Sequence, residues 1–270
     1  MQIQHDEFHI REFGNPDNPS LFCIHGWASN SHVFEPLAKL FKDHFHFVCV
    51  DLPGFGESKC EDAQQSYQLP YLIEGLLSVA PEKSAWLGWS LGGMLAVQAA
   101  AKLQLEKSDR IEALVSMNAN AKFIAHKSWK SGVPQPLFDG FMESIADVKT
   151  TLRRFAALTV VGEQKDMLQS LKWLQQNTQV PAPTSDVLNA SLKLLAQLDN
   201  RATLKQLTLP TLHLLSTDDA IVPNGVSQEL NKLNPMHPVS FVPNGSHASL
   251  VAQPQSVANG ILTFLEGLNA

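Results

Sequence analysis

The sequence predicts a doubly wound α/β fold, in which a mostly parallel sheet is covered by helices on both faces and interrupted by an inserted all-helical lid. Two observations support this fold class. Short apolar runs alternate with helical patterns at both ends of the chain, as in parallel β-α-β units. A central segment has helical periodicity and no convincing strand. We therefore expect a core of residues 1–120 and 198–270, with the lid at 121–197.

The first part of the chain supplies most of the expected strands. Residues 1–13 alternate loosely, as in a short strand or hairpin at a sheet edge. Continuous apolar runs, typical of strands buried on both faces, follow at 21–24, 45–50, 85–87 and 111–117. Helical patterns lie between them at 34–41, at 67–79 and from Gly92 onward.

The lid and the end of the chain continue this alternation. Helical spacing covers 138–155 and 167–173, and a proline-containing break precedes an amphipathic helix at 186–198 with Asp186 near its start. Strand patterns return at 211–215 and 239–242, and a closing helix is expected over 254–268.

Composition narrows the function classes. The chain has 270 residues, of which 44% are hydrophobic, and this suits one globular domain with an insertion. A formal net charge of -6 disfavours a nucleic-acid-binding protein. The first residues lack a basic stretch followed by an apolar one, and no run is long enough to span a bilayer. The expectation is a cytoplasmic monomer that binds neither nucleic acid nor membrane.

The pattern Gly88-Trp89-Ser90-Leu91-Gly92 lies between an expected strand and an expected helix. In a nucleophile elbow, a serine occupies a strained strand-to-helix turn, flanked by small residues because other backbone passes close by. The helix N-terminus there favours developing negative charge. A glycine-rich turn with an ordinary capping serine has the same letters, but the flanking strand and helix favour the nucleophile.

A serine nucleophile needs a base and an acid that orients it, and in parallel-sheet hydrolases these follow in the order Ser, Asp, His. His247 is the candidate base, because it alone of ten histidines lies in a loop after the last expected strand. Asp218 and Asp219 compete for the acid. Asp219 is favoured because the apolar residues after it can hold it at the sheet edge, and Asp218 is interpreted as a loop or capping residue.

Two backbone N–H groups are needed to bind the developing oxyanion. Leu91 follows the nucleophile, and Trp27 lies in the loop after an early strand, so their amides are the candidates. His25, in the same loop as Trp27, is interpreted as structural.

No cofactor or metal is expected. The chain has three cysteines and no C-x-x-C pair, which disfavours a cysteine-based zinc or redox site. The glycines at 54–56 do not open a helix, as a dinucleotide fingerprint requires. His44 and His46 lack further residues at convincing metal-ligand spacing.

These motifs resemble those of the α/β-hydrolases. The matching features are His25-Gly26-Trp27, the loop 51–58, the elbow at Ser90, Asp219 with Val222-Pro223, and His247. Within that family the chain is similar to the carboxylesterases of biotin synthesis, through segments 86–93, 154–158 and 186–189. The resemblance implies that the substrate is the methyl ester of a pimeloyl group on an acyl carrier protein. It also implies substrate contacts from Trp27, Ser90, Leu91, Phe155, Ala156, Ala157, Leu158, Thr159 and His247.

Two other function classes stay open. A general short-chain carboxylesterase or a carbon–carbon bond hydrolase has the same fold, and assays with p-nitrophenyl esters, carrier-protein esters and ring-cleavage diketones would separate them. A non-catalytic binding protein is disfavoured because no triad candidate is missing, although a fold alone does not establish activity.

Charge is distributed unevenly along the chain. The lid contains nine Lys/Arg and six Asp/Glu, a net of +3, although the whole chain is negative. Lys149, Arg153 and Arg154 cluster there, and the first two share a helix face. A solvated surface explains such a cluster, and so does a docking site for an acidic carrier protein.

Overall fold

The computed structural model describes residues 7–41, 43–164 and 166–268, and these form one seven-stranded sheet in the order β1-β3-β2-β4-β5-β6-β7. Only the pairing of β1 with β3 is antiparallel. The strands are β1 (Ile10–Phe13), β2 (Ser20–Ile24), β3 (His46–Val50), β4 (Ser84–Trp89), β5 (Ile111–Met117), β6 (Thr211–Ser216) and β7 (Val239–Val242). The predicted α/β fold class is confirmed.

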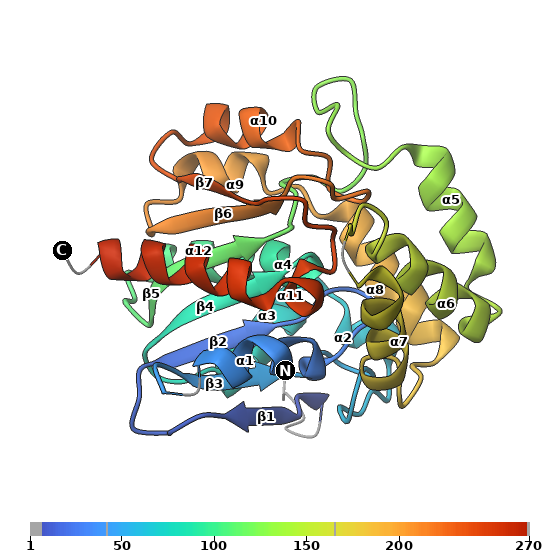
Figure 1. Ribbon diagram of the computed structural model, residues 1–270, viewed down its shortest axis with the longest axis horizontal. Coiled ribbons are helices and arrows are strands. Elements are labelled where there is room, and N and C mark those ends of the chain that lie inside the picture. Colours follow the sequence, from blue (N-terminus) through green and yellow to red (C-terminus); the bar gives the residue numbers. More distant parts are fainter. Residues whose placement is uncertain (1–6, 42, 165, 269–270) are drawn as a thin grey trace.

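Helices lie on both faces of the sheet (Figure 1). One face carries η2 (Ser31–Phe34), α1 (Glu35–Phe41), α11 (Ser249–Ala252) and α12 (Pro254–Gly267). The other face carries α2 (Ala63–Ser66), α3 (Leu69–Val79), α4 (Leu91–Leu105), α9 (Arg201–Gln206) and α10 (Val226–Leu233).

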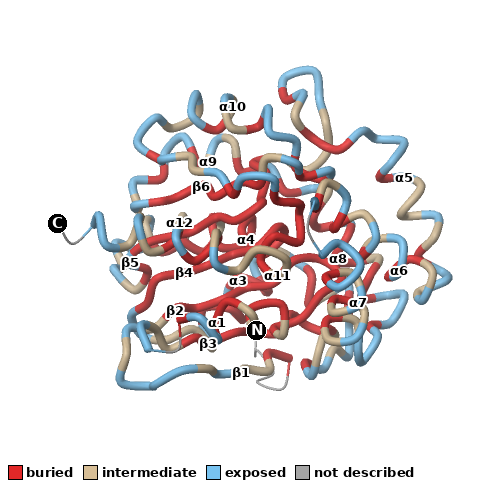
Figure 2. Tube along the Cα trace, viewed as in Figure 1, coloured by how far each residue is buried: buried red, intermediate tan, exposed pale blue. Residues whose placement is uncertain are grey.

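The two faces of the sheet bury separate hydrophobic clusters, because successive side chains of a strand point to opposite sides. In β2, Leu21 and Cys23 join the cluster under α1 and α12, whereas Phe22 and Ile24 join the one under α3 and α4. All four side chains are fully buried. The central strands accordingly lie in the buried interior (Figure 2).

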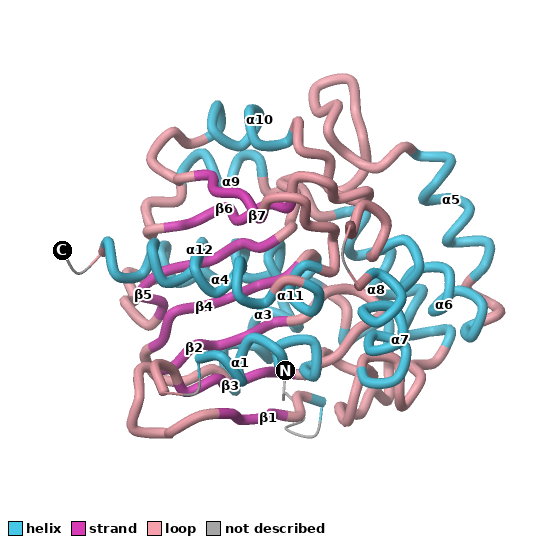
Figure 3. The backbone as a smooth tube through the Cα atoms, viewed as in Figure 1, coloured by secondary structure: helices cyan, strands magenta, loops and turns pink. Residues whose placement is uncertain are grey.

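Between β5 and α9, the described residues form four further helices. They are α5 (Gln135–Ser144), α6 (Val148–Thr159), α7 (Met167–Asn177) and α8 (Ser185–Gln197). They lie together beside the ends of β2, β4 and β5 that lead into the elbow and its neighbouring loops (Figure 3). No described residue between β5 and β6 belongs to a strand, and only isolated bridges occur there.

Several predicted boundaries need correction. The pattern at 138–155 contains two helices, because the Asp147 side chain accepts the Thr150 N–H at 3.0 Å and caps a new helix, α6. The pattern at 67–79 starts α3 at Leu69, after the separate short helix α2. Of the predicted strand at 1–13, residues 10–13 form β1, and residues 1–6 lie outside the described part of the chain.

In the described part of the chain, no helix is long and apolar enough to cross a lipid bilayer.

A pair of buried histidines packs between β6 and the turn before β7. The rings of His213 and His237 lie 5.8 Å apart between centroids. Burial lowers the pKa of His213 to about 3, with a further contribution from His237, and burial also lowers the pKa of His237.

We expect His213 to make the fold acid-sensitive. Its pKa is lowered in the folded protein, so the unfolded chain takes up this proton first, and stability falls as pH drops from about 6.5 toward 3. Between pH 7 and pH 5 the parent should lose about 2 kcal/mol of unfolding free energy that a His213→Leu variant does not lose. Urea unfolding at both pH values measures this, with the exposed His44→Leu as control. Equal pH dependence in parent and His213→Leu would contradict it.

Candidate active site

The turn between β4 and α4 holds Ser90 in an unusual backbone conformation, with φ 55° and ψ -118°. Non-glycine residues rarely adopt such angles, and the surrounding structure has to enforce them. Here the Ser90 N–H donates to the Met117 carbonyl at the end of β5, at 2.9 Å, and the Ser90 carbonyl accepts from Gly93 at 3.0 Å. The turn is therefore fixed between a neighbouring strand and the first turn of α4.

The glycines on either side of Ser90 are required by close backbone approach. A Cβ on Gly88 would lie 2.4 Å from the Gly92 carbonyl oxygen. A Cβ on Gly92 would lie 2.0 Å from the Ile24 carbonyl oxygen, at the end of β2. Neither position has room for any other residue type, so the spacing of the motif follows from the packing of β2, β4 and α4.

Asp219 and His247 come from the loops after β6 and β7 and meet in the interior. The His247 Nδ1–H donates to Asp219 Oδ2 at 2.7 Å, and both side chains are fully buried. Asp219 Oδ1 accepts the backbone N–H groups of Ile221 and Val222 at 2.7 and 2.9 Å. These bonds fix the carboxylate, and the carboxylate in turn places the imidazole proton on Nδ1.

The other imidazole nitrogen is left free to act as a base. His247 Nε2 is buried and has no hydrogen-bond partner among the described residues, so the Ser90 hydroxyl does not yet contact it. In unliganded enzymes the hydrogen bond between nucleophile and base often forms only with substrate present. The arrangement suits a base that takes the serine proton once the site is occupied.

The backbone of His247 is held by two residues that the sequence alone did not indicate. Trp89 Nε1 donates to the His247 carbonyl at 3.0 Å, and Asn118 Nδ2 donates to the same oxygen at 3.1 Å. Asn118 has φ 44°, in the left-handed region that asparagine tolerates better than most residues. The one sequence feature that could have pointed to Asn118 is its place directly after the buried strand β5.

The two candidate oxyanion donors come from different segments of the chain. Leu91 begins α4, and Trp27 lies in the turn after β2; neither amide donates a hydrogen bond within the described residues. His25 fills a structural role in the same turn, because its ring contacts the Gly26 carbonyl at 2.7 Å and accepts the Leu52 N–H at 2.9 Å. Burial lowers the pKa of His25, which favours the neutral ring.

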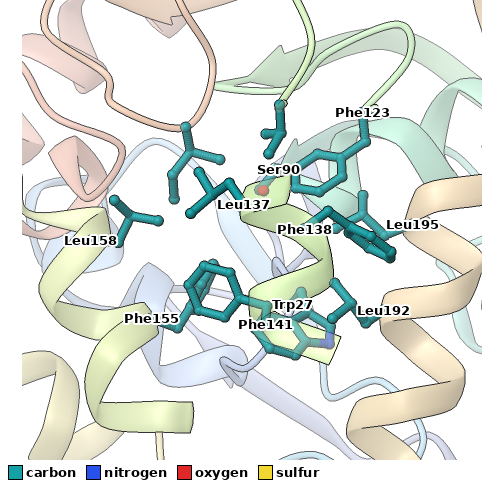
Figure 4. Close-up of a pocket in the computed structure, with 12 residues that line it drawn as sticks. Trp27, Ser90, Phe123, Leu137, Phe138, Phe141, Phe155, Leu158, Leu192 and Leu195 are labelled. Carbon is teal, nitrogen blue, oxygen red and sulfur yellow. The ribbon is translucent and has the colours of Figure 1, made fainter. Parts of the chain in front are cut away.

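Ser90 lies at the base of an apolar pocket roofed by the lid helices (Figure 4). The other lining residues are Trp27, Phe123, Val133, Leu137, Phe138, Phe141, Phe155, Leu158, Leu192, Leu195 and Ile221. The Trp27 ring packs edge-on against Phe155, with centroids 4.8 Å apart, and its Nε1 donates to the Leu188 carbonyl. None of the described lining residues is charged, so the pocket suits a neutral, largely aliphatic group.

The segment 155–159 only partly faces this pocket. Phe155 and Leu158 line it, whereas Ala156 and Thr159 pack beneath the lid and Ala157 is exposed. Of the five predicted contact residues, Phe155 and Leu158 therefore face this pocket, as expected when one helix face takes about every third or fourth residue.

The remaining candidates are at the surface. Asp218 is exposed and accepts a hydrogen bond from the Thr217 hydroxyl at 3.3 Å, so it does not reach His247. Lys149, Arg153 and Arg154 are exposed on α6, and they enter no ion pair of the described residues. A search of the described residues finds no cluster of three or more His, Cys, Asp or Glu side chains suited to a metal ion.

Comparison with known proteins gives the family. A family model described as the alpha/beta hydrolase fold matches residues 19–253. The chain belongs to the α/β-hydrolase family. A solved esterase from Exiguobacterium antarcticum superposes on this α/β-hydrolase with a TM-score of 0.83 over 96% of this chain and 95% of that one. At 16% identity, that likeness shows the fold alone.

Closer relatives carry more specific names. The pimeloyl-[acyl-carrier protein] methyl ester esterase of Aeromonas salmonicida is 33% identical over 260 residues, which are 95% of this chain and 98% of that protein. The biotin biosynthesis bifunctional protein BioHC of Cellvibrio japonicus is 34% identical over 253 residues. That alignment covers 93% of this α/β-hydrolase but only 48% of the bifunctional protein.

Replacing Ser90 tests the candidate nucleophile. Ser90→Ala should lower ester hydrolysis by roughly three or more orders of magnitude, as removal of a triad member does in other hydrolases. The fold should survive, because the lost hydroxyl has no hydrogen-bond partner among the described residues. Turnover of a p-nitrophenyl ester measures the effect, with thermal unfolding as the check on folding. Parent-level activity in this variant would exclude Ser90 as nucleophile.

Replacing each aspartate tests the candidate acid. In Asp219→Asn, the remaining oxygen still suits the Ile221 and Val222 N–H groups, so the new amide NH2 faces His247 and forces the ring proton onto Nε2. By analogy with the serine proteases, kcat should fall by a factor on the order of 10⁴. Asp218→Asn is the matched control and should keep nearly all activity. A larger loss in Asp218→Asn would transfer the role to that residue.

Proposed function

We propose that this α/β-hydrolase is a serine carboxylesterase that hydrolyses the methyl ester of a pimeloyl group carried on an acyl carrier protein, a step of biotin synthesis. Full-length similarity to esterases of that name supports the substrate. The observation that carries the chemistry is the buried Asp219–His247 pair, whose Nε2 has no hydrogen-bond partner among the described residues, together with Ser90 in the lining of an apolar pocket.

The geometry supports acyl transfer to water. Ser90 Oγ attacks the ester carbonyl carbon while His247 Nε2 takes its proton, and the imidazolium is stabilised by Asp219. In this proposal the Leu91 and Trp27 amides bind the negative oxygen of the tetrahedral intermediate. Its collapse expels methanol, which receives the proton from His247. Water then attacks the acyl-enzyme with His247 again as base. Collapse of the second tetrahedral intermediate releases the pimeloyl carboxylate, and Ser90 takes the proton back from His247.

The pocket suits this substrate better than its product. Its lining is aliphatic and aromatic, so it desolvates a methylene chain and a neutral ester at little cost. The carboxylate that forms carries a charge, and no basic side chain lines the pocket among the described residues to compensate its desolvation. Product release is therefore favoured once the ester has been cleaved.

The decisive assay uses purified carrier protein bearing methyl pimelate. The protein should release methanol and leave the thioester to the carrier intact, which mass spectrometry of the carrier distinguishes. Hydrolysis of p-nitrophenyl esters without any turnover of the carrier-bound ester would favour the alternative, a general short-chain carboxylesterase. The absence of any ester hydrolysis would leave a binding protein on this fold.

We propose that the carrier protein docks on α6. Lys149, Arg153 and Arg154 are exposed there, and the helix also contributes Phe155 and Leu158 to the pocket. Acyl carrier proteins are acidic, so a basic surface next to the pocket suits them. Asp147 caps α6 beside this surface. The pKa of its carboxyl is lowered chiefly by hydrogen bonds from Thr150, and the charges of Arg153 and Lys149 lower it further. Its negative charge makes the cluster less basic than its three cations alone.

Charge reversal tests this docking surface. Replacing Lys149, Arg153 and Arg154 with Glu should lower kcat/KM for the carrier-bound ester at low salt, and added salt should shrink the difference from the parent. Hydrolysis of a small p-nitrophenyl ester should barely change. A variant with Lys127, Lys130 and Lys172 changed to Glu is the control, because it alters the lid charge equally at exposed sites outside α6. Equal losses in both triple variants would contradict a specific surface on α6.

A further inference from the structure

The turn between α6 and α7 lies directly against both loops of the candidate triad. The Ala248 N–H, next to His247, donates to the Thr159 carbonyl at 3.0 Å. Gly162 has φ +95°, and a Cβ there would lie 1.9 Å from the Asp218 carbonyl oxygen. The lid therefore contacts the neighbours of both Asp219 and His247 through closely packed backbone atoms.

Glu163, at the end of this turn, is a carboxylate buried to 7% exposure. Its Oε2 accepts from the Ser246 hydroxyl at 3.3 Å, and its Oε1 accepts from Gln253 Nε2 at 3.0 Å. Burying a carboxylate is costly unless hydrogen bonds compensate it. Both hydrogen bonds of Glu163 connect the lid, which carries this carboxylate, to the segment that contains His247.

The two partners extend the network along the His247 loop. The Ser246 oxygen accepts the Ala248 N–H at 3.2 Å, so one hydroxyl connects both residues that flank His247. Gln253 Nε2 also donates to the Asn244 carbonyl at 2.9 Å. Glu163 thus fixes the beginning of the loop through Gln253 and its centre through Ser246. Chains of hydrogen bonds of this kind strengthen one another in a buried site.

We propose that Glu163 is a positioning residue, which holds the His247 loop from the lid so that Nε2 faces Ser90. This inference rests on the proposed role of His247 as the base. It makes this contact between lid and core a condition for an aligned base, because the carboxylate belongs to the lid and its hydrogen-bond donors belong to the core. Glu163 itself does not line the pocket, so its loss should affect the chemical step and spare binding.

Substitution of Glu163 tests the proposal with a p-nitrophenyl ester, whose turnover depends on the triad and not on a carrier protein. Glu163→Ala should lower kcat about tenfold or more with KM nearly unchanged, since small displacements of a catalytic group are costly. Glu163→Gln keeps one acceptor oxygen and should recover part of the loss. Glu143→Ala, at an exposed lid glutamate, is the control and should match the parent.

A double-mutant cycle separates positioning from a general effect on folding. Ser246→Ala should lower kcat as Glu163→Ala does, and the double variant should lose little more than either, because one hydrogen bond connects the two side chains. Additive losses, or a lower melting temperature with unchanged kcat, would overturn the proposal. If Glu163→Ala does not fold, Glu163→Gln and Ser246→Ala form the same cycle. A parent protein without esterase activity would instead overturn the proposed function.

Discussion

The site depends on one strained residue. Ser90 has φ 55° and ψ -118°, and the hydrogen bond to Met117 at the end of β5 fixes it there. This conformation turns the chain abruptly from β4 into α4 and leaves the side chain at the base of the pocket. The turn is possible only because Gly88 and Gly92 leave room for neighbouring backbone. Strain of about 1–3 kcal/mol is typical of such a residue, and the packing of β2, β4, β5 and α4 offsets it.

Around that turn, buried hydrogen bonds set the protonation pattern of the site. Asp219 uses one oxygen for two backbone N–H groups and the other for His247, so the imidazole proton stays on Nδ1. Asn118 and Trp89 hold the His247 backbone from the core, and Glu163 holds the adjoining Ser246 from the lid. The lid thus has two connected functions in this account: it forms the apolar roof of the pocket and it braces the loop of the base.

Sequence patterns predicted the parts of this site that depend on local chemistry or chain order. Ser90, Asp219 and His247 each follow a strand of the parallel part of the sheet. The strand order brings these three positions to the same edge of the sheet. Glu163 could not be found in this way, because its partners are far away in sequence and no local pattern marks it. Asn118 had only one sequence signal, its place directly after a buried strand, and its partners are equally far away in sequence. In the lid, helical periodicity did not reveal the cap at Asp147 that starts α6. It also did not show that Phe155 and Leu158 are the residues of 155–159 that face the pocket.

The central claim is tested most directly by identifying the residue that acts as the nucleophile. The protein is treated with a fluorophosphonate, which forms a stable phosphorus–oxygen bond to an activated serine with loss of fluoride, and the adduct is mapped by peptide mass spectrometry. The account predicts a single modified residue, Ser90, whose labelling slows sharply in Asp219→Asn. An unmodified protein, or an adduct on another serine such as Ser29 or Ser246, would contradict it.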